Sequence, residues 1–184
     1  MKTIVIDAGH GGDDPGAVNA GRLEKDDNLR LAQAVQQKLL AQGQRVVMTR
    51  DSDVFVALLT RSEIANDSGA DIFVSLHRNA VENNPSANGV ENWVYTNAAP
   101  AAKEYAQTVL SRIVDVGVQS NRGVKAGNFS VLRNTGMPAM LLEMGFITND
   151  RDNELFDQNL DAYAGAIAQA LLESLGEITA VRAG

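Results

Sequence analysis

The sequence contains no cysteine, no long apolar run and no cluster of basic residues. Without cysteine, the chain has no disulfide, no cysteine-type zinc finger and no thiol nucleophile. No apolar stretch reaches the roughly 18 residues that a membrane-spanning helix needs, so no transmembrane segment is predicted. The net charge of −7, without a lysine- or arginine-rich run, argues against a nucleic-acid-binding surface and against a polybasic membrane anchor.

Repeats, low-complexity segments and the phosphate-binding GxxxxGK[ST] motif are also missing. We expect no signal peptide at the N-terminus, because Lys2 leads directly into an apolar strand, and the route of export is not visible in the sequence. The length of 184 residues, with 45% hydrophobic and 21% charged residues, is typical of one globular domain. We predict a catalytic domain over residues 1–178, followed by a tail or the start of a linker over residues 179–184.

Short apolar runs alternate with amphipathic patterns along the chain. This alternation predicts a three-layer α/β domain, in which helices flank a mostly parallel, twisted sheet of about six strands. The predicted strands lie near residues 3–7, 45–48, 71–76, 89–95, 129–132 and 140–143. The predicted helices lie near residues 26–43, 56–66, 99–114 and 161–175. The first helix is expected to bury Leu29, Leu31, Ala32, Val35, Leu39 and Leu40, and the second carries the apolar residues Leu58, Leu59 and Ile64.

The two histidines of the chain follow apolar runs. His10 comes soon after the run 4–6, and His77 comes directly after the run 72–76. Glu143 likewise ends the run 139–142. Because the carboxyl ends of parallel strands form the edge at which such sheets bind ligands, we expect these three side chains to converge. Two histidines and a carboxylate around an open position are typical of a hydrolytic zinc site.

The residues alone leave the carboxylate ligand open. Glu24 lies just before a predicted helix and can reach the site, but local chemistry does not distinguish it from its acidic neighbours. These neighbours are Asp7, Asp13, Asp14, Asp26 and Asp27. Taken singly, His10 is also compatible with a loop-stabilising role, and His77 with a core histidine that bonds to the backbone.

Glu143 has two interpretations, because a carboxylate at the end of an apolar strand needs a partner. It is either a general base that faces a metal-bound water or one half of a salt bridge. The candidate salt-bridge partners are Arg61, Arg122 and Arg133. Substrate contact and ordinary loop hydrogen bonding are both open for Arg78, Asn79 and Asn128, whereas Trp93 is expected in the core or half-buried in a strand.

Several spaced motifs together resemble a known family. The segments DAGHGGDDPGA, LEKDDNL, VSLHRNA, GVENWVY and NFSVLRNTGMPAMLLEMGFITN are similar to those of zinc-dependent N-acetylmuramoyl-L-alanine amidases of the Amidase_3 type. The resemblance runs from about Lys2 to Leu175 and implies the α/β fold. It implies one Zn²⁺ per chain, held by His10, Glu24 and His77, and it implies that Glu143 is the catalytic glutamate. The sequence departs from the family at Arg78, where a small residue is more common, and this departure bears on substrate preference.

The resemblance also implies an activity. The protein would be a peptidoglycan hydrolase that cleaves the amide between the lactyl group of N-acetylmuramic acid and L-alanine of the stem peptide. Zinc-activated water would attack, with Glu143 as general base and then general acid. Such secreted hydrolases, autolysins and endolysins among them, act outside the cytoplasm on cell-wall or periplasmic peptidoglycan. We expect a monomer that works with a wall-binding module absent from this sequence.

Three alternatives compete with this activity. A zinc peptidase that cuts within the stem peptide would use the same ligands and glutamate, and its products would distinguish it. A catalytically dead wall-binding domain would be expected to lack a ligand or the glutamate, but all four residues are present. A sugar-cleaving enzyme of the lysozyme type would need a pair of carboxylates and would not need the histidines.

Overall fold

The structure, a computed structural model, describes residues 1–178. The tail predicted over residues 179–184, and with it the predicted domain boundary, lies outside the described residues. The strands are β1 (Thr3–Ala8), β2 (Val18–Asn19), β3 (Arg22–Leu23), β4 (Arg45–Met48), β5 (Ile72–Asn79), β6 (Val90–Tyr95), β7 (Asn121–Gly127) and β8 (Ala139–Phe146). The helices are α1 (Glu24–Ala41), α2 (Leu58–Asp67), α3 (Pro100–Val116), α4 (Ser130–Arg133) and α5 (Asp150–Ser174).

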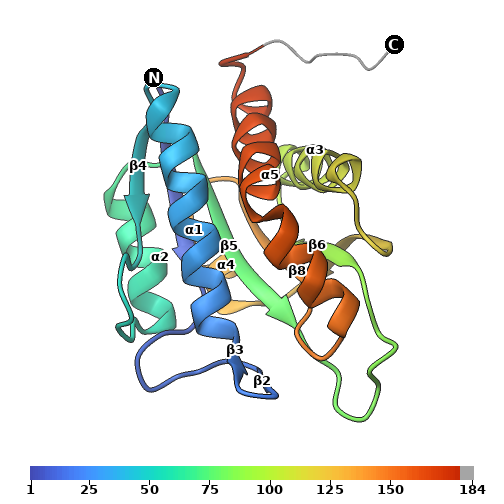
Figure 1. Ribbon diagram of the computed structural model, residues 1–184. Helices are drawn as coiled ribbons and strands as arrows, with labels where there is room; N and C mark the ends of the chain where they lie inside the picture. The colour runs from blue at the N-terminus through green and yellow to red at the C-terminus, as the bar shows by residue number, and fades with distance from the viewer. Residues whose placement is uncertain (179–184) are drawn as a thin grey trace.

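A six-stranded sheet in the order β4-β1-β5-β8-β6-β7 forms the middle layer (Figure 1). Neighbouring strands pair in parallel except β6 and β8, which pair antiparallel. The short strands β2 and β3 form a separate hairpin just before α1. The predicted three-layer α/β architecture with a mostly parallel six-stranded sheet is therefore confirmed.

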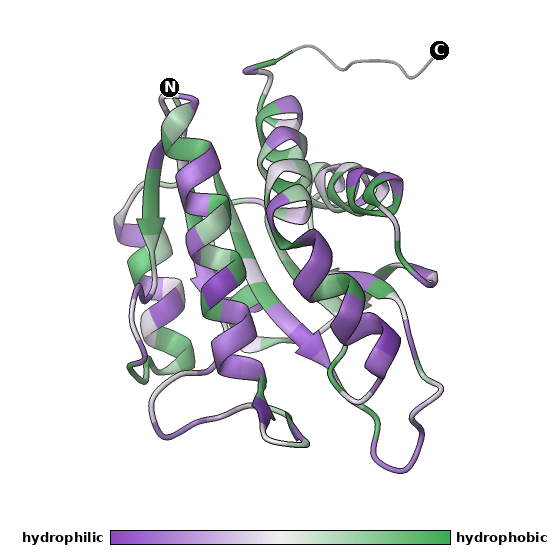
Figure 2. Cartoon of the chain, in the orientation of Figure 1, coloured by the Kyte–Doolittle hydropathy of each residue, from purple (hydrophilic) through white to green (hydrophobic). Residues whose placement is uncertain are grey.

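The two faces of the sheet are covered unequally. Alternate strand residues point to opposite faces: Ile4 and Ile6 belong to the large core under α1, α3 and α5, whereas Val5 belongs to a smaller cluster beside α2 and α4. Hydrophilic and hydrophobic residues alternate around α1 and α5, as expected for helices that bury one side (Figure 2). The face with α2 and the single-turn α4 has less cover, which leaves room for a cavity.

One predicted burial is wrong, because Leu40 is 46% exposed. Leu58 and Leu59, the apolar residues at the start of the second helix, are each 59% exposed. Helix α1 begins at Glu24, and its inward face passes through Leu39, so the next residue points outward. Helix α2 instead buries Arg61, because the guanidinium finds polar partners beneath the helix.

Two element predictions are also wrong. The segment predicted as a strand over residues 129–132 is mostly the short helix α4, and the strand in this region is β7. The sequence NRGVKAG of β7 has almost no apolar alternation, because an edge strand need not bury both faces. Helix α5 begins at Asp150 rather than near residue 161, because its first turns are polar and lack the apolar pattern on which the prediction relied. The side chain of Asn149 caps the helix by accepting from the Asp152 N–H.

Within residues 1–178, no helix has the length and apolar character to cross a membrane.

Candidate active site

Strand register brings three functional side chains into one row. His77 on β5 is the partner of Glu143 on β8, and Glu143 is the partner of Glu91 on β6. Partners that lie directly opposite point to the same face of a sheet. His77 and Glu143 lie inside their strands, which run further than the apolar residues predicted. The strand that carries Glu143 continues to Phe146.

His10 joins this row from the loop after β1. Its φ angle of 62° is unusual for a residue with a side chain and turns the loop sharply. Arg61 holds the turn by donating from Nη2 to the carbonyl of His10 at 2.8 Å. The imidazole Nδ1 lies 2.8 Å from a carboxylate oxygen of Asp14. Because Asp14 occupies this nitrogen, Nε2 is left to face Glu24, whose Oε1 is 3.3 Å away.

Glu24 is the carboxylate that the fold places between the two imidazoles. It is the first residue of α1, where the helix dipole favours a negative charge. Its Oε2 accepts from the Ala17 N–H at 2.8 Å, and its Oε1 lies 2.8 Å from Nδ1 of His77. One ligand atom from each of His10, Glu24 and His77 therefore lies within 4.8 Å of the others. The other acidic candidates are bound elsewhere or exposed: Asp7, Asp14 and Asp27 have their own partners, and Asp13 and Asp26 face solvent.

Glycines make the space that these side chains need. A Cβ at Gly9 would lie 2.2 Å from Cε1 of His77. A Cβ at Gly16 would lie 2.6 Å from both Glu24 Oε2 and His10 Cδ2. Two imidazole nitrogens and one carboxylate oxygen form the donor set that Zn²⁺ takes in hydrolytic enzymes. The residues present therefore fit zinc in both donor chemistry and space.

The three groups are strongly coupled electrostatically. Burial opposes a charge on His10, but the hydrogen bond and the negative charge of Glu24 outweigh it and raise the pKa of His10 to about 9. The same balance raises the pKa of His77. Burial opposes ionisation of Glu24, but its hydrogen bonds to both histidines hold its pKa well below the usual range. Without a metal, Glu24 therefore stabilises protonated imidazole at His10 and His77. A metal cation bound here would replace these protons and be stabilised by the same negative charge.

Glu143 has an environment unlike that of any other glutamate at the site. Its Oε2 atom is shielded from solvent and has no hydrogen-bonding partner within residues 1–178. Loss of hydration raises the pKa of Glu143 to about 7. The salt-bridge interpretation of this residue is wrong, because each candidate arginine bonds to another residue. Arg61 pairs with Asp7, Arg122 with Glu91, and Arg133 with Asn128.

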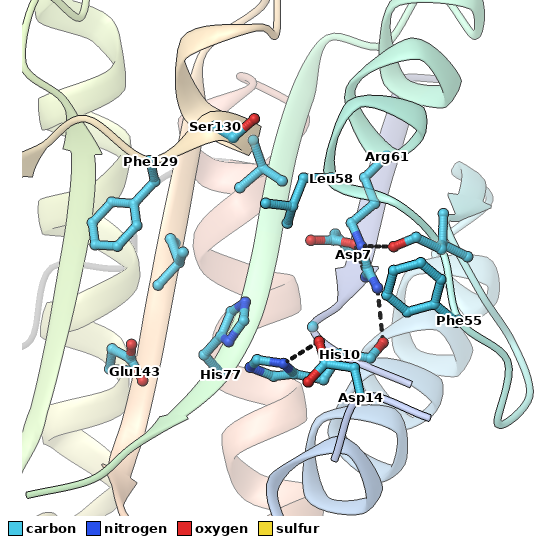
Figure 3. A pocket seen from close by; sticks show the side chains of 14 residues that line it. Asp7, His10, Asp14, Phe55, Leu58, Arg61, His77, Phe129, Ser130 and Glu143 are labelled. Atoms are coloured by element: carbon cyan, nitrogen blue, oxygen red, sulfur yellow. Dashed lines mark hydrogen bonds and ion pairs between the residues drawn. The ribbon is translucent and has the colours of Figure 1, made fainter. Parts of the chain in front are cut away.

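A cavity of about 510 Å³ opens beside these groups (Figure 3). His10, His77 and Glu143 line one part of it, and the aromatic rings of Phe55 and Phe129 lie on opposite sides. The other apolar lining residues are Val56, Leu58, Val131 and Leu141. Phe55 and Leu58 remain 60% and 59% exposed because they border this cavity instead of packing into the core.

Sequence reasoning missed the polar framework beneath the cavity. Buried Asp7 accepts from Arg61 Nη1 at 2.7 Å and from Thr49 Oγ1 at 2.6 Å. Arg50 donates to the carbonyls of Ala8 and Gly9 at 2.8 and 3.0 Å. These bonds fix the loop that carries His10. Arg50 follows β4 without any motif, so the sequence offered no signal for it, and Arg61, in α2, was considered only as a partner of Glu143.

Arg78, the departure from the family pattern, does not line the cavity. Its side chain lies on the other face of the sheet, where it pairs with Asp27, donates to Asn153 and stacks 4.3 Å above the ring of Phe156. Arg78 therefore joins β5 to α1 and α5.

The remaining polar candidates have bonds within the chain. The side-chain amide of Asn79 donates to Glu91 at 3.0 Å, and the side-chain oxygen of Asn128 accepts from Arg133 at 2.8 Å. The half-buried Trp93 donates from its indole to Glu91 and packs edge-on against Phe129.

A family model and similar curated proteins point to the same protein family. Residues 4–175 match the model of the N-acetylmuramoyl-L-alanine amidase family. The chain is 38% identical to an endolysin of Bacillus phage SPP1 over 184 residues, which cover 96% of the chain and 66% of the endolysin. It is also 38% identical to the sporulation-specific N-acetylmuramoyl-L-alanine amidase of Bacillus subtilis (strain 168), covering 83% of the chain and 59% of that protein. The chain thus spans about two thirds or less of these curated relatives.

Solved structures agree with this comparison. The N-acetylmuramoyl-L-alanine amidase of Clostridium difficile 630 superposes with a TM-score of 0.91 at 40% identity, over 95% of this chain and 97% of that one. The amidase AmiC2 of Nostoc punctiforme superposes with a TM-score of 0.89 at 38% identity, again over 95% and 97% of the two chains.

Proposed function

The chain belongs to the N-acetylmuramoyl-L-alanine amidase family, and from this premise we propose that it is a zinc-dependent peptidoglycan hydrolase. Its substrate is the amide between the lactyl group of N-acetylmuramic acid and L-alanine of the stem peptide. One observation carries the proposal: a cluster of two histidines and a carboxylate lies within 4.8 Å, beside the unpartnered carboxylate of Glu143.

His10, Glu24 and His77 would hold one Zn²⁺. When bound, zinc supplies a Lewis acid that polarises the amide carbonyl and makes water a stronger nucleophile at neutral pH. The bond between Asp14 and His10 Nδ1 selects the tautomer with a free Nε2 lone pair. The N–H of Ala17, through Oε2 of Glu24, holds the other oxygen of that carboxylate toward the histidines.

Glu143 carries the proton. It accepts a proton from the attacking water as the new bond from oxygen to carbon forms. It then gives that proton to the nitrogen as the amide bond breaks, leaving a lactyl carboxylate and the free amine of L-alanine. An unpartnered carboxylate whose pKa is raised to about 7 suits both steps, because it accepts and releases a proton near neutral pH.

The surroundings of the chemistry follow from this activity. The apolar walls of the cavity, Phe55 and Phe129 among them, exclude water and accept the methyl groups and sugar faces of a muramoyl substrate. The protein acts outside the cytoplasm, because peptidoglycan lies there. We further propose a monomeric domain that acts beside a wall-binding module.

The test is digestion of purified peptidoglycan, followed by mass spectrometry of the products. The proposal expects sugar chains free of peptide and peptides with a new L-alanine amino terminus. A chelator should abolish both products, and added zinc should restore them. Cuts within the stem peptide would indicate a zinc peptidase, and the absence of products from zinc-loaded protein would indicate a binding domain; either result contradicts the proposal.

A further inference from the structure

Two basic side chains share a single carboxylate oxygen at the edge of the sheet. Oε2 of Glu91 accepts from Arg122 Nε at 2.7 Å and from Lys125 Nζ at 2.5 Å. Its Oε1 accepts from Asn79 and Trp93, so Glu91 is fully satisfied. Two positive charges against one negative charge leave a local surplus of +1 in a chain whose net charge is −7. This surplus is not needed to satisfy Glu91.

Both cations keep donors free for a ligand. A guanidinium has five N–H donors and an ammonium has three. Arg122 uses Nε for Glu91, and within residues 1–178 its two terminal nitrogens make no hydrogen bond. Lys125 makes one hydrogen bond among the same residues. The side chains are 38% and 33% exposed, so solvent and ligands reach them.

The position of these cations is defined by the sheet. The row runs from His77 on β5 through Glu143 on β8 to Glu91 on β6, and β7 with both cations comes next. The cations therefore lie on the side of Glu143 that faces away from the histidines. The cavity reaches from Phe55 on the far side of the histidines to Phe129, which packs on Trp93 of β6, and its walls are mainly apolar. Arg122 and Lys125 are not among the residues that line it, so the site combines an apolar cavity with a positively charged edge beyond Glu143.

The two products of the proposed reaction differ in the same manner. N-acetylated sugars carry no charge and have apolar faces, whereas a stem peptide carries carboxylates. We propose that Arg122 and Lys125 form a subsite for a carboxylate of the stem peptide, which directs the peptide toward β7 and the sugar toward Phe55. A carboxylate that bridges a guanidinium and an ammonium makes charge-assisted hydrogen bonds to both. This inference rests on the proposed function.

The test compares two soluble muramoyl-peptides that differ only in the stem peptide, whose carboxylates are free in one and converted to amides in the other. The variant Arg122→Gln/Lys125→Gln removes both cations. The matched control Arg112→Gln/Lys38→Gln removes one arginine and one lysine from ion pairs with Glu173 and Asp161, on the helices of the opposite face. KM and kcat are measured for each protein on each substrate.

The proposal expects the double variant to raise KM about tenfold for the free-carboxylate substrate, with KM for the amide substrate unchanged. The control should behave as wild type on both substrates, and Arg122→Lys with Lys125→Arg should restore most of the preference. An equal effect on both substrates would show that the cations act only through Glu91 and would overturn the subsite, as would no effect on either. If wild type cleaves neither substrate, the proposed function itself fails.

Discussion

Glu143 and Glu91 lie directly opposite each other on β8 and β6, yet their carboxylates differ in hydrogen bonding and in the direction of their pKa shifts. Glu91 accepts four hydrogen bonds, two of them from cations. Glu143 has an oxygen with no partner among the described residues. Burial raises the pKa of Glu143, whereas Lys125 and Arg122 outweigh burial and lower the pKa of Glu91. One carboxylate is thereby kept as a stable anion and its neighbour is kept ready to exchange a proton.

The first prediction concerns the pH dependence of stability in metal-free protein. The pKa of Glu143 rises from 4.5 to about 7 on folding, so the folded state favours its protonated form. Its contribution to the free energy of unfolding is complete below pH 4.5 and is lost as the pH rises to about 7. Glu143→Gln stays neutral, so we expect it to gain roughly 2–3 kcal/mol relative to wild type between pH 4 and pH 8.

Glu91→Gln is the matched variant and should show the opposite trend. The pKa of Glu91 is lowered on folding, so its contribution is present at neutral pH and is lost as the pH falls below the ordinary glutamate range. The variant should be less stable than wild type from pH 8 down to about pH 4.5, and the difference should shrink only as the pH falls further. Denaturant unfolding in the presence of a chelator measures both. The same trend in the two variants would contradict the opposed environments of these residues.

A second prediction separates the proton carrier from the metal ligands. Glu143→Gln keeps the shape of the side chain but removes its basicity, so kcat on peptidoglycan fragments should fall by about 10²–10⁴. Bound zinc should remain at one per chain. His77→Ala should instead lose zinc, because one of the three clustered ligand groups is gone. Activity assays with elemental analysis of the purified variants check this, and near-normal turnover of Glu143→Gln would require another proton carrier.

Gly9→Ala provides a steric test of the metal centre. The added Cβ would lie 2.2 Å from Cε1 of His77, so the imidazole cannot keep the position in which its Nδ1 lies 2.8 Å from Glu24 Oε1. We expect affinity for zinc to fall at least tenfold in chelator competition, while the circular dichroism spectrum stays native. Gly165→Ala is the control, because a Cβ there meets no atom of the described chain within 4 Å. If Gly9→Ala binds zinc as wild type does, His77 is not a ligand in the position that the structure gives it.

The fourth prediction addresses the arginine that departs from the family pattern. Arg78 is 2% exposed and pairs with the equally buried Asp27, so Arg78→Ala removes one of the two guanidinium groups that bind this carboxylate and leaves Arg22 as the other. Loss of a hydrogen bond to a charged group typically costs about 1.5–3 kcal/mol. Arg151→Ala removes an exposed partner of Glu154 and should cost much less, because exposed ion pairs contribute little to stability. Urea unfolding compares the two, and equal costs would show that Arg78 contributes no more than a surface ion pair.

Much of the architecture could be predicted from the sequence, because burial leaves a local trace. The apolar runs before His10 and His77 predicted strands, and their alternation with amphipathic segments predicted the layers. Where an element buries few side chains, its sequence shows no such apolar pattern. The edge strand β7 has almost no apolar alternation and was missed, and the exposure of Leu58 reflects a cavity that the periodicity of α2 does not report.

The functional site, too, could be predicted from the sequence only in part. The residue types and their places after apolar runs indicated a zinc site with His10, His77 and Glu143, and family resemblance alone singled out Glu24. Only the tertiary structure decided which groups face each other. A shift of one residue in the pairing of β8 would turn Glu143 to the opposite face, away from His77 and Glu91. Chain order does not encode this register, because it is set by the packing of strands that lie far apart in the sequence.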